Sequence, residues 1–213
     1  MLTSQKIKSH YDSLASRYET RWLHYIQAQA DWILGHWSSI GPAREKTVLD
    51  LGCGTGIILQ RIHERFPTLS LAGVDISTGM LARGRQRLPL ASFTEGNIED
   101  ASFAAGLPSA DIILSLSVLH HLTDVERHLR LLAKLVKPEG TIFLADFSLD
   151  GIVMKFGDLY FRFFQSHYHG SLSQRELSGK SMQVFRSAET ISAVLRPDWF
   201  WRIQIYRIDI GSK

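Results

Sequence analysis

Cysteine is nearly absent from this chain, since Cys53 is the only one among 213 residues. A single thiol forms neither an internal disulfide nor a cysteine cluster for a metal, so we expect a reducing compartment, with the cytoplasm as the default. Long apolar runs are missing too: none reaches the roughly 18 residues of a membrane span, and the first residues lack the apolar core of a signal peptide. We therefore expect no stable insertion into a membrane.

Charge of one sign is also scarce. The 24 Lys and Arg residues nearly balance the 21 Asp and Glu residues, which gives a formal net charge of +3, and no basic run is present. A nucleic-acid partner is therefore not expected. Internal repeats and low-complexity linkers are missing as well. With 45% hydrophobic residues, a chain of 213 residues suits one ordinary globular domain.

The first 40 residues have the pattern of an amphipathic helix. Their apolar side chains recur at steps of three and four, and a Ser/Gly/Pro break at residues 38–42 predicts the end of the helix. The stripe consists of Ile7, Tyr11, Leu14, Tyr18, Trp22 and Tyr25.

Beyond this break, short β-branched and leucine-rich runs alternate with helical patterns. The predicted strands are TVLDL from residue 47, LSLAGVD from 69, ASFTEG from 91, ADIILSLS from 110 and TIFLADFS from 141. Ser77 can cap a helix that continues to Leu88, while Thr123 and Glu126 predict a capping box for the helix after the fourth strand, which residues 137–140 end. The alternation predicts an α/β fold with a doubly wound, three-layer, Rossmann-like sheet.

Polar residues follow the strands at the edge where such a sheet binds its ligand. The turn after the first strand has the form G-x-G-x-G, with Gly52, Gly54 and Gly56 preceded by Asp50. It lacks the third glycine of a dinucleotide fingerprint and the lysine of a P-loop, so neither is predicted. Asp75 ends the second strand, where a carboxylate can accept both hydroxyl hydrogens of a ribose.

Four segments in this order resemble the successive motifs of class I S-adenosylmethionine-dependent methyltransferases of the small-molecule type: VLDLGCGTG, GVDIS, GNIED and LVKPEGTIFLADF. The resemblance runs from about residue 48 to residue 147, and the N-terminal YDSLASRYE resembles the tyrosine-bearing helix of small-molecule members. It implies an enzyme with S-adenosylmethionine as cofactor and a mostly parallel sheet ordered 3-2-1-4-5-7-6, with one antiparallel strand near the C-terminus.

The resemblance also implies one domain over residues 1–213. Residues 1–42 form a helical cap, residues 43–150 the cofactor-binding core, and residues 151–213 a lid segment and C-terminal strand. Within the core, the glycines approach the methionine part and the ribose, Asp75 holds the ribose hydroxyls, and Asp50 orients the loop or the amino group. The expected cofactor-binding residues are Tyr11, Tyr18, Asp50, Gly52, Cys53, Gly54, Gly56, Asp75, Ile76, Met80, Asn97, Ile98, Ser115 and Leu116.

Two adjacent histidines, His120 and His121, follow the fourth strand. Both cannot easily reach one ion, and no Cys/His partner stands at ligand spacing, so no metal site is predicted. A histidine suits removal of a proton from an oxygen or nitrogen acceptor, and Asp146 on the neighbouring fifth strand can orient it. Either His120 is a general base, with His121 as the alternative, or the pair only shapes the pocket wall.

The C-terminal third gives weaker signals. Only residues 199–210 have a clear strand pattern, so the other of the last two strands is short, missing or hidden near residues 182–185. The aromatic segment 151–170 is either a helix on the sheet edge or a substrate lid; a third interpretation, a surface for a lipid-like acceptor, is weakened by Asp158. A lid would face the pocket with Tyr160, Phe164, His167, Tyr168 and His169.

The implied reaction is an in-line transfer of the methyl group to an oxygen or nitrogen atom of a small-molecule acceptor, such as a quinone, a sugar, a natural product or a lipid-like molecule. Residues 115–118 lack both the Asn/Asp-Pro-Pro-aromatic motif of DNA amino-methyltransferases and the paired glutamates of protein arginine methylation. A cofactor-binding regulatory subunit without turnover remains the alternative class. The aromatic residues also suit the face of a homodimer.

Overall fold

The computed structural model describes residues 2–37, 45–165, 168–198 and 201–211. In these residues seven strands form one sheet in the order β3-β2-β1-β4-β5-β7-β6. Neighbouring strands are parallel, except that β7 is antiparallel to both β5 and β6. This confirms the strand order and the single antiparallel strand that the resemblance implied. The strands are β1 (Thr47–Leu51), β2 (Ser70–Asp75), β3 (Ser92–Glu95), β4 (Ala110–Leu116), β5 (Val136–Phe147), β6 (Glu189–Leu195) and β7 (Ile203–Asp209).

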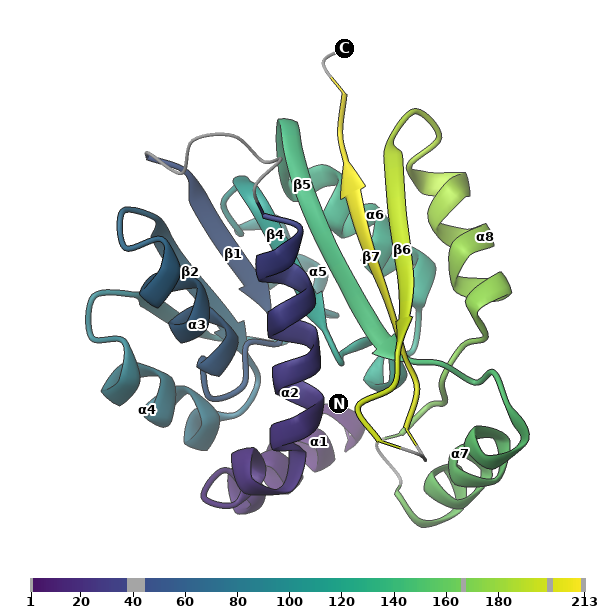
Figure 1. Ribbon diagram of the computed structural model, residues 1–213. Coiled ribbons are helices and arrows are strands. Elements are labelled where there is room, and N and C mark those ends of the chain that lie inside the picture. The colour runs from purple at the N-terminus through teal and green to yellow at the C-terminus, as the bar shows by residue number, and fades with distance from the viewer. Residues whose placement is uncertain (1, 38–44, 166–167, 199–200, 212–213) are drawn as a thin grey trace.

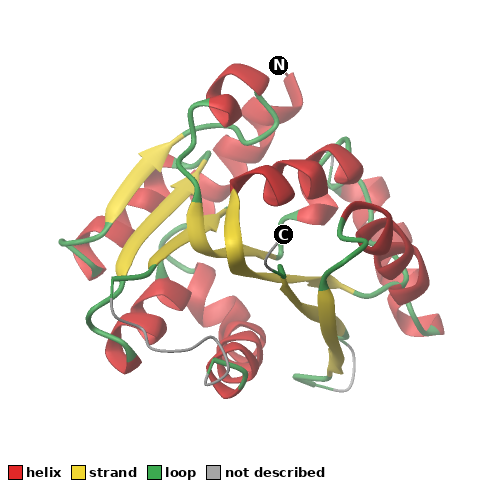
Figure 2. Ribbon diagram, turned by 90° about the horizontal axis from the view of Figure 1, so that it is seen from above, coloured by secondary structure: helices red, strands yellow, loops and turns green. Residues whose placement is uncertain are grey.

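Helices cover both faces of the sheet (Figures 1 and 2). Successive side chains of a strand point to opposite faces, so β4 sends Leu114 into one apolar core and Ile113 into the other. The predicted three-layer α/β fold is thus confirmed. The first core includes residues of α2 (Tyr18–Gly35), α3 (Ile57–Arg65) and α4 (Thr78–Arg87); the second includes residues of α6 (Val125–Leu135) and α8 (Gln174–Val184), with Phe103 of the short α5 (Ala101–Ala105) packed against it.

The predicted N-terminal helix is in fact two helices. α1 (Leu2–Leu14) and α2 are separated at residues 15–17, and α2 bends again at Trp22, where φ is −114° and ψ is 15°. The bend lets α2 pack along the sheet while α1 crosses the carboxyl ends of the strands (Figure 1). The sequence did not indicate this break, because the apolar residues keep their spacing of three and four from α1 into α2. α2 ends at Gly35, and the predicted break at residues 38–42 lies outside the described residues.

One predicted helix cap is confirmed and one is wrong. The hydroxyl of Ser77 accepts from the amide of Met80 at the start of α4. α6, however, is capped by Asp124, whose carboxylate accepts from the amide of Arg127. The amide and hydroxyl of Thr123 instead donate to Glu99. The helix therefore begins one residue later than the capping box predicted, because a carboxylate at the next position competes for the same amides.

The strand sought near residues 182–185 is also not there, because α8 covers that segment. The strand that the sequence left unplaced is β6, which pairs with β7 at the edge of the sheet. Its side chains are exposed or half-buried, whereas those of β7 are nearly all buried. Because an edge strand is only partly buried, it needs no continuous apolar pattern, so the sequence of β6 gives only a weak indication of a strand. No described helix has the length and apolarity to cross a membrane.

Replacing Asp111 by asparagine should lower the stability of the fold near neutral pH by about 1 kcal/mol. Asp111 joins the starts of three strands: it accepts from the amide and hydroxyl of Thr47 at 2.8 and 2.7 Å and pairs with Lys137 at 2.9 Å. Burial alone would raise the pKa of Asp111, but the Thr47 hydrogen bonds and Lys137 lower it to about 2.

Because this pKa lies below the unfolded value, the carboxylate stabilises the fold above about pH 4, and the contribution disappears as the pH falls through about 2. Urea unfolding of wild type and the variant, near pH 7 and again near pH 3, measures the effect. The difference between the two proteins should shrink on acidification. An equal difference at both pH values would contradict the prediction.

Candidate active site

A glycine turn joins β1 to α3. Gly52, Gly54 and Gly56 have positive φ angles of 83°, 53° and 71°. The amide of Gly52 donates to the carbonyl of Val74 at 2.8 Å, which ties the turn to β2. A Cβ atom on Gly52 would collide with a methyl group of Val118, whereas one on Gly54 would meet nothing within 4 Å. The turn therefore presents bare backbone to an open space at Gly54.

Two carboxyl groups border this turn. Asp75 accepts from the amides of Gly54 and Ser77 at 2.8 and 2.9 Å. Asp50 is 2% exposed, and among the described residues its Oδ1 has no hydrogen-bond partner. Burial, followed by the charge of Asp75, raises the pKa of Asp50 to about 8. Burial also raises the pKa of Asp75, although its backbone hydrogen bonds act in the opposite direction. A cation or a pair of hydroxyl donors would relieve this crowding of acids.

The crevice beside the turn consists of two adjoining compartments. Gly52, Gly54, Leu116, Ser117 and His121 line both of them, together with the tyrosines at positions 11 and 18. We call the first the polar-edge compartment; it contains Asp75, Ile76, Met80, Asn97 and Ile98. We call the second the aromatic compartment; besides Asp50, Cys53 and His120 it contains Trp22, Tyr25, Phe147, Phe161, Tyr168 and Trp201.

α1 is held across the polar-edge compartment at two points. The carboxylate of Asp12 accepts from the hydroxyl of Ser77 at 2.6 Å and from the amide of Gly79 at 2.8 Å, so it is anchored to the start of α4. Burial raises the pKa of Tyr11 well above its usual value, so its phenol keeps its proton, and its hydroxyl hydrogen-bonds Nε2 of His121 at 2.6 Å. Asp12 was missed by sequence reasoning, since a lone acid after Tyr11 matches no motif.

His120 lines the aromatic compartment and is paired with the buried Asp146 behind it. The carboxylate of Asp146 accepts from Nδ1 of His120 at 2.6 Å and from the backbone amide of His120 at 3.1 Å. The imidazole lies between the rings of Phe147 and Tyr168, with centroids 5.0 and 5.4 Å away. Among the described residues, Nε2 of His120 has no hydrogen-bond partner. The carboxylate therefore fixes one tautomer, and the second nitrogen remains able to act on a ligand.

Three predicted residues, Gly56, Ser115 and Asp146, line neither compartment. Ser115 faces the opposite side of the sheet, where its hydroxyl hydrogen-bonds His128 of α6 at 2.8 Å. The expectation that Ser115 lies near the methionine part is therefore wrong, because strand side chains alternate between faces. Its place at the crevice is taken by Leu116 and by Ser117, which accepts from Gln29 of α2. Gly56 starts α3 and packs against Phe93.

The predicted lid is a helix, α7 (Ile152–Phe164), followed by a turn. Of the residues expected to face the pocket, only Tyr168 does so; Tyr160 and Phe164 are 57% and 73% exposed. His169 contributes only its backbone amide, which donates to the carbonyl of His120. His167 lies outside the described residues. The inward-facing residues are instead Phe161 and Gln165, one and five positions after Tyr160.

Comparison with known sequences points to one kind of domain. Residues 49–144 match the family model described as a methyltransferase domain. A trans-aconitate 2-methyltransferase from Deinococcus radiodurans is 39% identical over 99 residues, which cover 45% of this chain and 35% of that protein. A malonyl-(acyl-carrier protein) O-methyltransferase from Priestia megaterium is 24% identical over 149 residues, which cover 69% of this chain and 53% of that protein. The chain thus spans about half or less of the length of these relatives.

Solved structures extend the likeness in fold to nearly the whole chain. Magnesium protoporphyrin IX methyltransferase from Synechocystis PCC 6803, with bound S-adenosylhomocysteine, has a TM-score of 0.75 at 14% identity and covers 96% of this chain and 98% of its own. A plantazolicin methyltransferase, in complex with a substrate analogue and S-adenosylhomocysteine, has a TM-score of 0.70 at 17% identity and covers 98% and 97%.

Two observations indicate that the crevice fits a ligand such as S-adenosylhomocysteine. The buried Oδ1 atom of Asp50 has no partner among the described residues, which suits a ligand ammonium group. Open space at the position of a Gly54 Cβ atom leaves room for a ligand against the backbone. Asp75 stands beside that space at the carboxyl end of β2, the place of a ribose-binding acid.

Proposed function

We propose that this chain carries a class I S-adenosylmethionine-dependent methyltransferase domain and that it methylates an oxygen or nitrogen atom of a small-molecule acceptor. The observation that carries the proposal is the juxtaposition of two features: the glycine turn with its acids, and an aromatic compartment lined by a histidine that is hydrogen-bonded to a buried carboxylate. The glycine turn suits the methyl donor. The aromatic compartment suits a neutral acceptor that must lose a proton.

In the proposed mechanism, the residues of the polar-edge compartment hold the donor, together with Asp50 from the adjoining aromatic compartment. Asp75 accepts from the ribose hydroxyls, Ile76 and Met80 pack against the adenine, and Asp50 faces the amino group. The bound cofactor supplies an electrophilic methyl group. The aromatic walls align the acceptor for in-line attack and exclude water, which lowers the entropic part of the barrier.

His120 acts as the general base in this proposal. Its Nε2 takes the proton from the acceptor O–H or N–H as that atom bonds to the methyl carbon and the carbon–sulfur bond breaks, leaving S-adenosylhomocysteine. Asp146 holds the reactive tautomer and stabilises the imidazolium. We favour His120 over His121 because the Nε2 atom of His121 is already hydrogen-bonded to the hydroxyl of Tyr11. His121 is then a positioning residue that keeps α1 across the crevice.

The acceptor is proposed to be a planar, largely apolar molecule. Trp22, Tyr25, Phe147 and Trp201 form a continuous set of ring contacts, with centroids 4.7 to 6.4 Å apart, along one side of the compartment. Such walls fit a quinol, a phenol or another ring with an alkyl substituent better than a sugar. Because α1, α2, α7 and the sheet all contribute to the crevice, we propose that the chain works as one domain.

Calorimetric titration followed by a transfer assay tests the function. We expect S-adenosylmethionine and S-adenosylhomocysteine to bind and NADH not to bind. With ring-bearing phenols, quinols and amines as acceptors, we expect methylated product and S-adenosylhomocysteine in equal amounts. Cofactor binding without turnover on any acceptor would favour a regulatory subunit, and binding of NADH alone would overturn the proposal.

Cofactor binding near pH 7 should release close to one proton per protein. The raised pKa of Asp50, about 8, keeps most of this group protonated at that pH in the ligand-free protein. A ligand ammonium beside Oδ1 favours the carboxylate and lowers this pKa, so the proton leaves and affinity increases as the pH rises toward 8.

Titrations of S-adenosylhomocysteine in two buffers with different ionisation enthalpies measure the number of protons released. The Asp50→Asn variant has no titrating group at this position, so its release should fall close to zero. Equal proton release by the wild type and the variant would contradict the prediction.

A further inference from the structure

α7 has two different faces. Its inner face carries the buried Met154 and Asp158, together with Phe161, which stacks on Trp201 at 5.8 Å in the aromatic compartment. We define its outer face as Ile152, Phe156, Leu159, Tyr160, Phe163 and Phe164, which are 52% to 79% exposed. A helix that is apolar on both sides has one more apolar surface than the fold uses.

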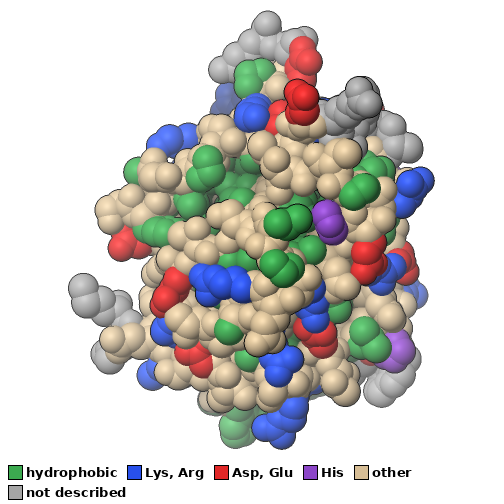
Figure 3. Space-filling view, turned by 90° about the vertical axis from the view of Figure 1, so that its left-hand side faces the viewer, with side chains coloured by type: hydrophobic (Ala, Val, Ile, Leu, Met, Phe, Trp, Pro, Cys, Tyr) green, Lys and Arg blue, Asp and Glu red, His purple; other side chains and the backbone are tan. Residues whose placement is uncertain are grey.

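The outer face is a continuous stripe. Residues 152, 156, 159 and 163 follow one another at steps of three and four, and residues 160 and 164 extend the stripe by the same step. On the side of the molecule formed by α3 and α4, in contrast, acidic and basic side chains are interspersed (Figure 3). Large apolar side chains are therefore concentrated on α7 rather than spread over the surface.

The exposed charges of α7 are all basic. Lys155 and Arg162 are exposed at the margin of the stripe. The single acid of the helix, Asp158, is turned inward, where it accepts from Tyr168, from the amide of Ser171 and from Arg162 at 2.7, 2.8 and 2.6 Å. Asp158 therefore does not interrupt the apolar face, contrary to the expectation from sequence. An apolar stripe bordered by cations complements an anionic, apolar partner.

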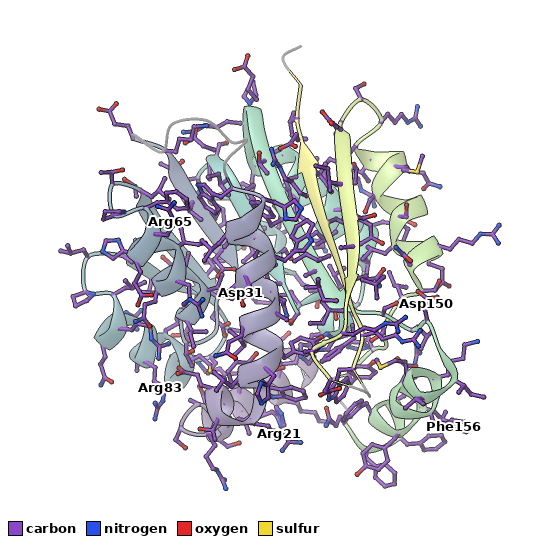
Figure 4. The ribbon with its side chains drawn as sticks, viewed as in Figure 1. Arg21, Asp31, Arg65, Arg83, Asp150 and Phe156 are labelled. Carbon is purple, nitrogen blue, oxygen red and sulfur yellow. The ribbon has the colours of Figure 1, made fainter. Side chains whose placement is uncertain are left out.

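The helix that carries the outer face also forms part of the wall of the crevice, through Phe161. α7 and α1 are at the same end of the molecule, at the carboxyl ends of the parallel strands (Figure 1). Phe156 of α7 and Arg21 of α2 are both at this end in Figure 4, and Arg21 lines the aromatic compartment. Only the thickness of one helix separates the outer face from the aromatic compartment.

We propose that the outer face of α7 is an interfacial surface that docks the opening of the aromatic compartment onto an anionic lipid bilayer, without crossing it. The proposal rests on the proposed function, because it gives an apolar acceptor a direct path from the lipid to His120. A second copy of the chain fits less well. A symmetric contact through this stripe would bring the Lys155 and Arg162 margins of the two copies close together.

Flotation of the full chain with vesicles tests this docking. We expect binding to phosphatidylglycerol/phosphatidylcholine vesicles and weaker binding to pure phosphatidylcholine, because Lys155 and Arg162 meet no anionic headgroups there. The double variant Phe156→Ser/Phe163→Ser should lower the vesicle partition coefficient at least about tenfold. Leu90→Ser is the matched control, since Leu90 is 96% exposed but lies away from α7, and it should bind vesicles like the wild type.

Two further measurements make the outcome decisive. Light scattering detects a dimer: one that forms in the wild type and dissociates in the double variant would assign the stripe to a second copy and overturn the proposal. Absence of vesicle binding by the wild type, or equal binding by the double variant, would also overturn it. Titration with S-adenosylhomocysteine tests the proposed function separately. We expect unchanged affinity in the double variant, and failure of all the proteins to bind this ligand would count against the function rather than the docking.

Discussion

Replacing His120 by alanine is expected to lower kcat about 10²- to 10⁴-fold while leaving the affinity for S-adenosylhomocysteine nearly unchanged. The imidazole is buried beside Asp146, with Nδ1 and Oδ1 2.6 Å apart, and lines the aromatic compartment. Its loss removes the proton acceptor without touching the Asp75 contacts.

Single-turnover and steady-state kinetics over a pH series measure this effect. Asp146→Asn should reduce kcat in the same direction, because an amide stabilises the imidazolium less well than a carboxylate does. His24→Ala is a suitable control, because His24 is exposed on α2 and lines neither compartment. Full turnover with an unchanged pH profile in the His120 variant would contradict the general-base role. His120 would then only shape the wall of the aromatic compartment.

Replacing Asp75 by asparagine should weaken the binding of S-adenosylhomocysteine about 100-fold. Two hydrogen bonds from ribose hydroxyls to a buried carboxylate are worth roughly 2–3 kcal/mol more than those to an amide, and about 1.4 kcal/mol corresponds to a factor of ten. The asparagine oxygen can still accept from the amide of Gly54 or of Ser77, so the turn should retain much of its structure.

Asp111→Asn is the matched comparison for Asp75→Asn, because it makes the same change at the opposite end of the sheet. It should lower stability but leave the dissociation constant within about twofold of the wild type. Calorimetry gives the dissociation constants, and urea unfolding gives the stabilities. Equal affinity in the Asp75 variant and the wild type would exclude Asp75 from ribose binding.

The polar-edge side of the crevice could be predicted largely from sequence. Asp75, Ile76, Met80, Asn97 and Ile98 all line that compartment, as expected. Met80 lies in the first turn of α4 and the others stand at or just after the end of a strand. Parallel strands bring those ends together whatever the details of packing. Ser115 shows the limit of this reasoning, since a shift of one residue along β4 moves a side chain to the other face.

The aromatic compartment could not be predicted in the same way. Trp22, Phe147, Phe161 and Trp201 come from α2, the end of β5, α7 and the segment before β7. In sequence each belongs to an ordinary apolar or aromatic pattern. In α7, Phe161 faces the compartment while its neighbour Tyr160 is exposed, and only the seating of the helix on Met154 and Asp158 decides between them.

The sequence by itself determined the α/β class, the strand order through its resemblance, and the nature of the cofactor. These three properties depend on residues close together in the sequence, such as a glycine turn after a buried strand or an acid at the next strand end. Their spacing is the same before and after folding. Tertiary structure decided the pairing of His120 with Asp146, the anchoring of α1 across the crevice through Asp12, and the aromatic compartment. Such features join side chains distant along the chain, so they exist only after long-range packing has fixed which side of each helix and strand faces inward.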